Sequence, residues 1–400
     1  MRTSCSIFLG LTRLVSTVGI PIQEVGQVRK AGRRISAPVF VGLITTALVL
    51  ASCLSTNLQP IGGGTGSFTA EPDEAQLWSS LQAAEGKVAP QTQLYQDQRL
   101  NAYLAALVTR LTPPGYASAG GPPIRVLVRK DPRLNAAAMA HGVIVVNSGI
   151  LARVDGEAQL AAVLGHELTH ITHRHTIREH RAAQNRQTAI NVAAFVGTLA
   201  LAAAAVDQAN RGNYAASQAI VGAGAPLLQV GLQLSYTAMV SGYSRDMETE
   251  ADQQGIRLMA QAGYPPREMA QFFRLMLGDS SDRGSIETFF WGSHPRTSER
   301  IEAAEAFARS YQSTISPQGT NQEFESRMAQ VRVANAEWDA YLGRTALAKS
   351  QVDRTLRTIP ERPDKQILTR VLYANLVASS SNGLSRRGQS AAATEWFNKA

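Results

Sequence analysis

The chain has 400 residues, enough for one large or two modest domains with a hydrophobic core. Hydrophobic residues make up 44% of it and charged residues 18%, a globular mixture that excludes wholesale disorder. The formal net charge is +8, but most of the excess lies in residues 1–52, so nucleic acid is not an expected partner. The two cysteines, Cys5 and Cys53, exclude a thiol-ligated zinc site and make an internal disulfide unexpected.

Residues 1–52 have the pattern of a signal peptide. A basic cluster at residues 29–34 precedes an apolar run over residues 37–52, which is short for a membrane span. The run leads into Leu-Ala-Ser-Cys at residues 50–53, which resembles the bacterial lipobox, where the leader is cut before the cysteine and the cysteine is lipidated. An uncleaved anchor with an incidental cysteine is the alternative.

The residues after Cys53 lack the aspartate that retains such lipoproteins in the inner membrane. We therefore expect lipidation at Cys53 and a location on the periplasmic face of the outer membrane of a Gram-negative cell.

The part of the chain that follows predicts a small sheet beside a helical body. Glycines indicate a flexible tether over residues 53–70, before a folded domain that begins at residue 71. Leucines at three-to-four spacing predict a helix over residues 100–111, and apolar stretches at residues 124–129 and 143–147 predict strands. Helical patterns dominate after that, so the expected fold class is α+β and mostly helical, with a C-terminal helical region.

The helix expected from residue 155 onward contains His166-Glu167-Leu168-Thr169-His170. Histidines four residues apart lie on one side of an α-helix, one turn displaced, so both imidazoles can reach one metal ion. Two neutral imidazoles and a carboxylate suit Zn²⁺ and leave a fourth position for water. Glu167 is placed to accept the proton of that water and pass it to the leaving amine. We therefore expect one zinc ion per chain.

Three further histidines follow this motif: His173, His175 and His180. We expect them to be charged or capping residues at the end of a helix, and extra metal ligands are the alternative.

The third ligand is expected from the acidic stretch at residues 243–252. Glu248 and Asp252 stand one turn apart on a helix, so one carboxylate can bind the metal while the other accepts a hydrogen bond from a ligand imidazole. Asp246 and Glu250 face elsewhere on that helix and are expected to be solvated.

These motifs resemble those of the M48 family of zinc metallopeptidases, a group of gluzincins. The matching elements are His166-Glu167-x-x-His170, Ser244-Arg245-x-x-Glu248-x-x-x-Asp252, residues 131–151 and residues 293–300, in the family's order. The resemblance implies that His166, His170 and Glu248 bind zinc and that Glu167 is the catalytic acid and base. It also implies that Asp252 orients a ligand and that Arg300 braces the site through a carboxylate.

The lipoprotein leader favours the BepA-like and HtpX-like periplasmic branch of the family, whose members act in outer-membrane protein quality control. At Ala137 to Ala140 the sequence departs from relatives, which often carry a phenylalanine followed by a small-Gly turn.

A protease must hold its peptide extended, and strand addition to an exposed sheet edge does this through main-chain hydrogen bonds. We expect this substrate edge at residues 142–147, and an ordinary sheet strand is the alternative. The residues are Gly142, Val143, Ile144, Val145, Val146 and Asn147.

His294, which precedes Pro295, is a further catalytic candidate. It could stabilise the oxyanion or occupy the open zinc position in a resting state, and a plain helix-start histidine is the alternative.

Two regions are added to the protease domain expected over residues 71–316. An almost uncharged insert at residues 187–240 predicts a helical hairpin that walls the active site or touches the bilayer surface, with a transmembrane hairpin as the alternative. Residues 317–400 predict an accessory helical region, and residues 388–400 faintly resemble a tetratricopeptide helix. A plain capping helix pair is the alternative there.

The sequence thus predicts a lipid-anchored periplasmic zinc endopeptidase. The resemblance implies unfolded or misassembled envelope proteins as substrates and leaves open a contact with the envelope assembly machinery. The alternative is a zinc-bearing chaperone or assembly scaffold with latent proteolysis.

Overall fold

The computed structural model describes residues 54–63, 67–88, 90–188, 243–279, 297–310, 321–359 and 364–381. The predictions for Cys53, most of the insert, His294 and residues 388–400 lie outside these ranges. Within them, no helix combines the length and the hydropathy needed to cross a bilayer.

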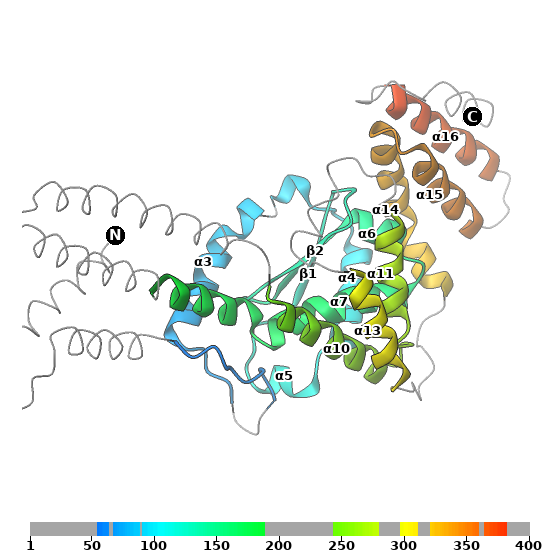
Figure 1. Ribbon diagram of the computed structural model, residues 1–400. Helices are drawn as coiled ribbons and strands as arrows, with labels where there is room; N and C mark the ends of the chain where they lie inside the picture. The colour runs from blue at the N-terminus through cyan, green and yellow to red at the C-terminus, as the bar shows by residue number, and fades with distance from the viewer. Residues whose placement is uncertain are drawn as a thin grey trace, which may run out of the picture. The chain divides into compact units, whose positions relative to one another are not determined.

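A three-stranded sheet lies beside the main helices (Figure 1). Its strands are β1 (Arg125–Arg129), β2 (Ala136–Met139) and β3 (Val143–Asn147), in the order β1-β3-β2, with β1 parallel and β2 antiparallel to β3. The turn from β2 to β3 requires Gly142, because its φ is +95° and a Cβ there would lie 2.4 Å from the carbonyl oxygen of Pro123. The sequence missed β2 because alanine is a weak strand former, and pairing with β3 holds it extended.

β3 is the central strand, so the prediction of a substrate-binding edge at Gly142–Asn147 is wrong. β1 pairs with one side of its backbone and β2 with the other, and the residues from Val143 to Asn147 are all buried. A central strand has no row of unpaired N–H and C=O groups to offer a peptide. Among the described strands β2 is an outer one, and its Ala137 is exposed.

The two faces of the sheet pack against different elements. Ile144 and Val146 of β3 join the main core with apolar residues of α4 and α7, while Val143 and Val145 pack on the other face with Leu81 of α3. Successive strand residues point to opposite faces, so burial on both faces explains the unbroken apolar run of β3.

Helices make up most of the described chain. They are α3 (Pro72–Val88), the short 3-10 helix η1 (Gln91–Gln93), α4 (Gln98–Leu111), α5 (Pro114–Ser118), α6 (Ser148–Arg153), α7 (Glu157–Thr172), α10 (Arg245–Gln261), α11 (Glu268–Asp279), α13 (Thr297–Arg309), α14 (Asn321–Tyr341), α15 (Thr345–Thr358) and α16 (Lys365–Ser381). Residues 175–188 are also helical. With the small sheet, these helices confirm the predicted mostly helical α+β fold.

α14 belongs to two hydrophobic cores. Phe324, Met328 and Val331 from its first half lie in the main core. Ala336 and Ala340 from its second half lie in a smaller core with residues of α15 and α16. A shared helix therefore joins the C-terminal helical region to the core that carries the sheet.

The described residues of the expected tether are packed against the folded domain. Ile61 is 3% exposed, and its N–H donates a 2.8 Å hydrogen bond to the carbonyl oxygen of Thr172 at the end of α7. Leu54 exchanges two hydrogen bonds of 2.8 Å with the side chain of Asn185. These contacts join Leu54 and Ile61 to the folded domain. The flexible tether over residues 53–70 stays a prediction, because residues 64–66 lie outside the described ranges.

Candidate metal centre

α7 carries the His-Glu-x-x-His motif on a helix that is buried along most of its length. Leu160, Leu164 and Leu168 lie in the main core, so the helix cannot rotate without exposing apolar side chains. His166 and His170 are 4% and 1% exposed, and their ring centroids are 4.8 Å apart. Core packing therefore fixes the two histidines as a pair.

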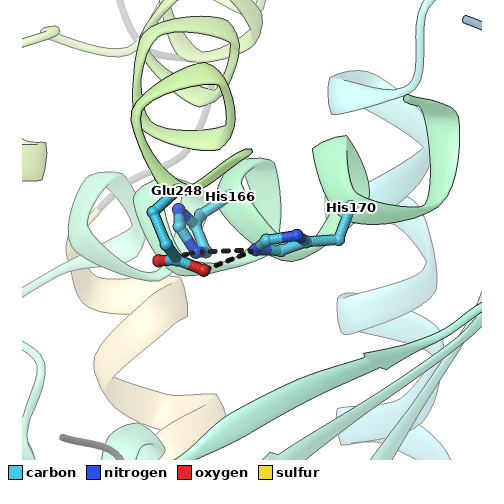
Figure 2. A group of neighbouring side chains, drawn as sticks. All are labelled: His166, His170 and Glu248. Carbon is cyan, nitrogen blue, oxygen red and sulfur yellow. Dashed lines mark hydrogen bonds and ion pairs between the residues drawn. The ribbon is translucent and has the colours of Figure 1, made fainter. Parts of the chain in front are cut away.

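α10 brings a carboxylate to this pair. Ser244 caps the helix, because its side chain accepts a hydrogen bond from the N–H of Met247. Glu248 lies in the first turn and is 4% exposed. Figure 2 shows Glu248 facing His166 and His170 from the neighbouring helix.

The two helices approach each other at glycines. A Cβ on Gly255 of α10 would lie 3.0 Å from the backbone nitrogen of His166 and 3.0 Å from Cε of Met269. A Cβ on Gly165 of α7 would lie 3.2 Å from the carbonyl oxygen of Gly255. Because neither residue has a Cβ, the backbones come close enough for Glu248 to reach the histidines.

The ligand atoms of the three side chains lie close to the spacing of a tetrahedral metal site, and all fall within 4.8 Å of one another. The Nε2 atoms of His166 and His170 are 3.1 Å apart. Of the Glu248 carboxylate, Oε2 lies 3.6 Å from Nε2 of His166 and Oε1 lies 3.5 Å from Nε2 of His170. A tetrahedral zinc ion with bonds of about 2.0–2.2 Å separates its ligand atoms by roughly 3.3–3.6 Å. The residues present therefore fit such an ion.

The Nδ1 atom of His166 is held by a buried carboxylate. It lies 2.9 Å from Oδ1 of Asp252. Arg300 of α13 donates to the same carboxylate, over 2.7 Å to Oδ1 and over 2.8 Å to Oδ2. Burial raises the pKa of Asp252, but Arg300 and the hydrogen bond from His166 outweigh it and lower the pKa to about 2. The carboxylate is therefore ionised at pH 7 and fixes the proton of His166 on Nδ1.

Residues that the sequence analysis did not assign to the site surround His170. The ring of Tyr243 stacks on the ring of His170 with centroids 4.0 Å apart. His175 places its Nδ1 atom 2.9 Å from Nδ1 of His170, and Glu250 lies 3.3 Å from Nε2 of His175. The prediction that Glu250 is simply solvated is therefore wrong.

The expectation of a charged or capping histidine is also wrong for His175. Its side chain is 0% exposed, and burial lowers its pKa to about 4, so the ring is neutral at pH 7. On an uninterrupted helix, residues five apart point about 140° apart. The chain turns at His173 and Arg174, where Arg174 has a φ of +58°, and this turn brings His175 back to His170. His173 is the C-cap residue of α7.

The structure brings together five of the residues singled out from the sequence: His166, His170, Glu248, Asp252 and Arg300. Glu167 follows His166 on α7 and is 1% exposed. Of the residues expected at a substrate edge, Val143–Asn147 form the central strand and Gly142 lies in the turn before it.

Two histidines and a glutamate on one helix, completed by a glutamate from a second helix, define a metallopeptidase centre. The chain matches the model of peptidase family M48 over residues 98–308. It belongs to this family, which confirms the resemblance seen in the sequence and implies a metal cofactor.

Relatives point to the same family. A Vibrio cholerae protein whose name contains the words beta-barrel assembly-enhancing protease is 29% identical over 265 residues, which are 65% of this chain and 50% of that protein. The beta-barrel assembly-enhancing protease of Escherichia coli K12 is 27% identical over 53% of this chain and 39% of its own length. Mitochondrial metalloendopeptidase OMA1 of Schizosaccharomyces pombe is 33% identical over 44% of each chain. The chain thus spans about half the length of these relatives, or less.

The contact between α7 and α10 can be tested with glycine substitutions. We expect Gly255→Ala to lower the free energy of unfolding by about 1–3 kcal/mol and to weaken zinc binding, because the added Cβ forces the helices apart. Gly86→Ala in α3 is the matched control, since nothing lies within 4 Å of a Cβ there. That change should instead stabilise the protein by up to about 1 kcal/mol through helix propensity. Urea unfolding with and without zinc measures the free energy of unfolding and the stabilisation by zinc. A gain in stability for Gly255→Ala as well as for Gly86→Ala would contradict the close contact.

Proposed function

We propose that this chain is a zinc-dependent endopeptidase that cleaves unfolded or misassembled envelope proteins. The observation that carries the proposal is the convergence of His166, His170 and Glu248 within coordination spacing, with Glu167 next to His166. Two buried imidazoles and one carboxylate form a donor set that suits Zn²⁺.

The residues have separate tasks in peptide hydrolysis. A bound zinc ion would act as a Lewis acid, which would polarise the scissile carbonyl and lower the pKa of the attacking water. Glu167 takes a proton from the attacking water as its oxygen bonds to the carbonyl carbon. Glu167 then gives this proton to the amine nitrogen as the C–N bond breaks. Asp252 and Arg300 keep the imidazole of His166 in the orientation and tautomer of a ligand.

We place the extended substrate along β2, which corrects the expected edge at residues 142–147. Among the described strands β2 pairs with β3 alone, and it packs against α7, the helix that carries the histidines. Its outer side can therefore form main-chain hydrogen bonds with a peptide close to Glu167. Such bonds ignore side chains, which suits a protease that acts on many unfolded sequences.

The substrate class and the location rest on the leader sequence and on the relatives. The lipobox-like ending of the leader supports an anchor at Cys53 on the periplasmic face of the outer membrane. Two of the relatives are named for enhancing beta-barrel assembly, which supports misassembled envelope proteins as substrates and the envelope assembly machinery as a partner.

Glu167→Gln tests the catalytic role. The change keeps the shape of the side chain but removes the base, so we expect cleavage of casein to fall by at least about 100-fold. Zinc content should stay at the wild-type level, whereas Glu248→Ala should lose zinc. Equal degradation by wild type and Glu167→Gln would rule out this chemistry. Binding of casein without cleavage by the wild type would favour the zinc-bearing scaffold.

Backbone-methylated peptides test the role of β2. In a synthetic peptide that spans a bond cleaved in casein, N-methylation of every second amide near that bond should raise KM by about 3- to 10-fold, because each methyl group removes one hydrogen bond to the strand. Methylation of the intervening amides, which point away from β2, should change KM little. The same KM for both sets of peptides would argue against strand addition.

Fractionation of cells tests the anchor. We expect Cys53→Ala to move the protein from the membrane fraction to the soluble fraction, because the lipidated side chain is lost. Cys5→Ala, which changes the other cysteine of the chain, should leave the protein attached. If Cys53→Ala stays attached through alkaline carbonate extraction, the membrane contact lies elsewhere, and the insert becomes the first place to look.

A further inference from the structure

The two nitrogens of His170 face different partners. Nε2 points to His166 and Glu248, at 3.1 and 3.5 Å, and Nδ1 points to Nδ1 of His175 at 2.9 Å. A neutral imidazole that gives Nε2 to a metal carries its proton on Nδ1. In the proposed zinc site, His170 therefore donates a hydrogen bond to His175.

The hydrogen bond from His170 also determines which nitrogen of His175 carries the proton. Because its Nδ1 accepts from His170, its own proton sits on Nε2, which lies 3.3 Å from Oε2 of Glu250. Arg178 donates to this oxygen over 2.8 Å through Nη1. The chain of contacts from His170 thus runs through His175 to Glu250 and ends at Arg178.

His166 is connected to a carboxylate by fewer hydrogen bonds than His170. His166 donates directly to Asp252, which is held by Arg300. Both carboxylates come from α10, two and four residues after Glu248. Each histidine is therefore tied, through its Nδ1 atom, to an α10 carboxylate that is paired with an arginine, but only His170 uses a second histidine as the link.

We infer that His175 is a positioning residue that orients His170 for zinc, with Glu250 and Arg178 holding His175. The inference rests on the proposed zinc site. The surroundings of the rings agree with it: Tyr243 covers one face of His170, and its hydroxyl lies 2.9 Å from Oγ1 of Thr176, the residue after His175. His170 is thus fixed on its face by Tyr243 and on its edge by His175.

Substitutions of His175 distinguish a role in orienting His170 from a role in packing alone. His175→Phe keeps a ring but removes the acceptor, and we expect zinc affinity, measured by competition with a chromogenic chelator, to fall by about 10- to 100-fold. His175→Asn places an amide oxygen near the former Nδ1 position and should recover most of this loss. The visible spectrum of the Co²⁺-loaded protein should change in His175→Phe and stay close to wild type in His175→Asn.

A second pair of variants covers the case in which His175→Phe does not fold. Glu250→Ala and Asp246→Ala each remove one negative charge from α10, but Asp246 is exposed and only Glu250 contacts His175. We expect Glu250→Ala to weaken zinc binding by about 3- to 10-fold and Asp246→Ala by less than about twofold.

The outcomes distinguish this inference from the proposed function. Wild-type zinc affinity in His175→Phe, or equal affinities in Glu250→Ala and Asp246→Ala, would overturn the inference while the zinc site stands. A wild-type protein that binds no zinc would instead overturn the proposed function itself. Urea unfolding of the metal-free variants checks that a lost affinity does not come from a lost fold.

Discussion

The metal centre depends on the close approach of α7 and α10 at Gly165 and Gly255. Glu248 lies on a helix that is far in sequence from the two histidines, and its side chain reaches them only because these backbones nearly touch. The axes of packed helices are generally roughly 8–10 Å apart, depending on the size of the side chains at their contact. Glycine costs about 1 kcal/mol in a helix relative to alanine, and the burial of Leu160, Leu164 and Leu168 offsets this cost.

The second constraint is the burial of charge beside the ligands. Asp252 and Arg300 are 6% and 8% exposed, and Arg300 also lies over the ring of Phe273 at 4.4 Å. A buried ion that loses its partner typically costs about 3–5 kcal/mol, so the carboxylate and the guanidinium must be placed together. α13, which carries Arg300, is for this reason part of the metal centre although it supplies no ligand.

Segments distant in sequence hold both ends of α7. Before its first turn, the guanidinium of Arg354 in α15 donates to the carbonyl oxygens of Val154 and Asp155. After its last turn, the N–H of Ile61 donates to the carbonyl oxygen of Thr172. Ile61, which follows the expected lipidation site, therefore contacts the last residue of α7, and α15 contacts the residues that lead into α7.

The chemistry that lies within a single helix could be predicted from the order of the residues. The i, i+4 spacing of His166 and His170 and the apolar stripe beneath them are local properties, because the period of the α-helix fixes them. Spacing on α10 likewise indicated Glu248 and Asp252, although it could not say which one binds the metal. The mostly helical fold and the strands β1 and β3 also followed from local patterns.

Features that depend on contacts between elements far apart in the chain could not be predicted in this way and follow from the fold. The central place of β3 follows from pairing with β2, whose alanines gave little strand signal. The contact of His175 with His170 follows from the turn at Arg174, because residues five apart on an uninterrupted helix would point in different directions. The contact of Ile61 with the end of α7 is also long-range, and the composition of its segment does not predict it. In each case the deciding energy comes from contacts between residues far apart in the chain, and no local spacing encodes those contacts.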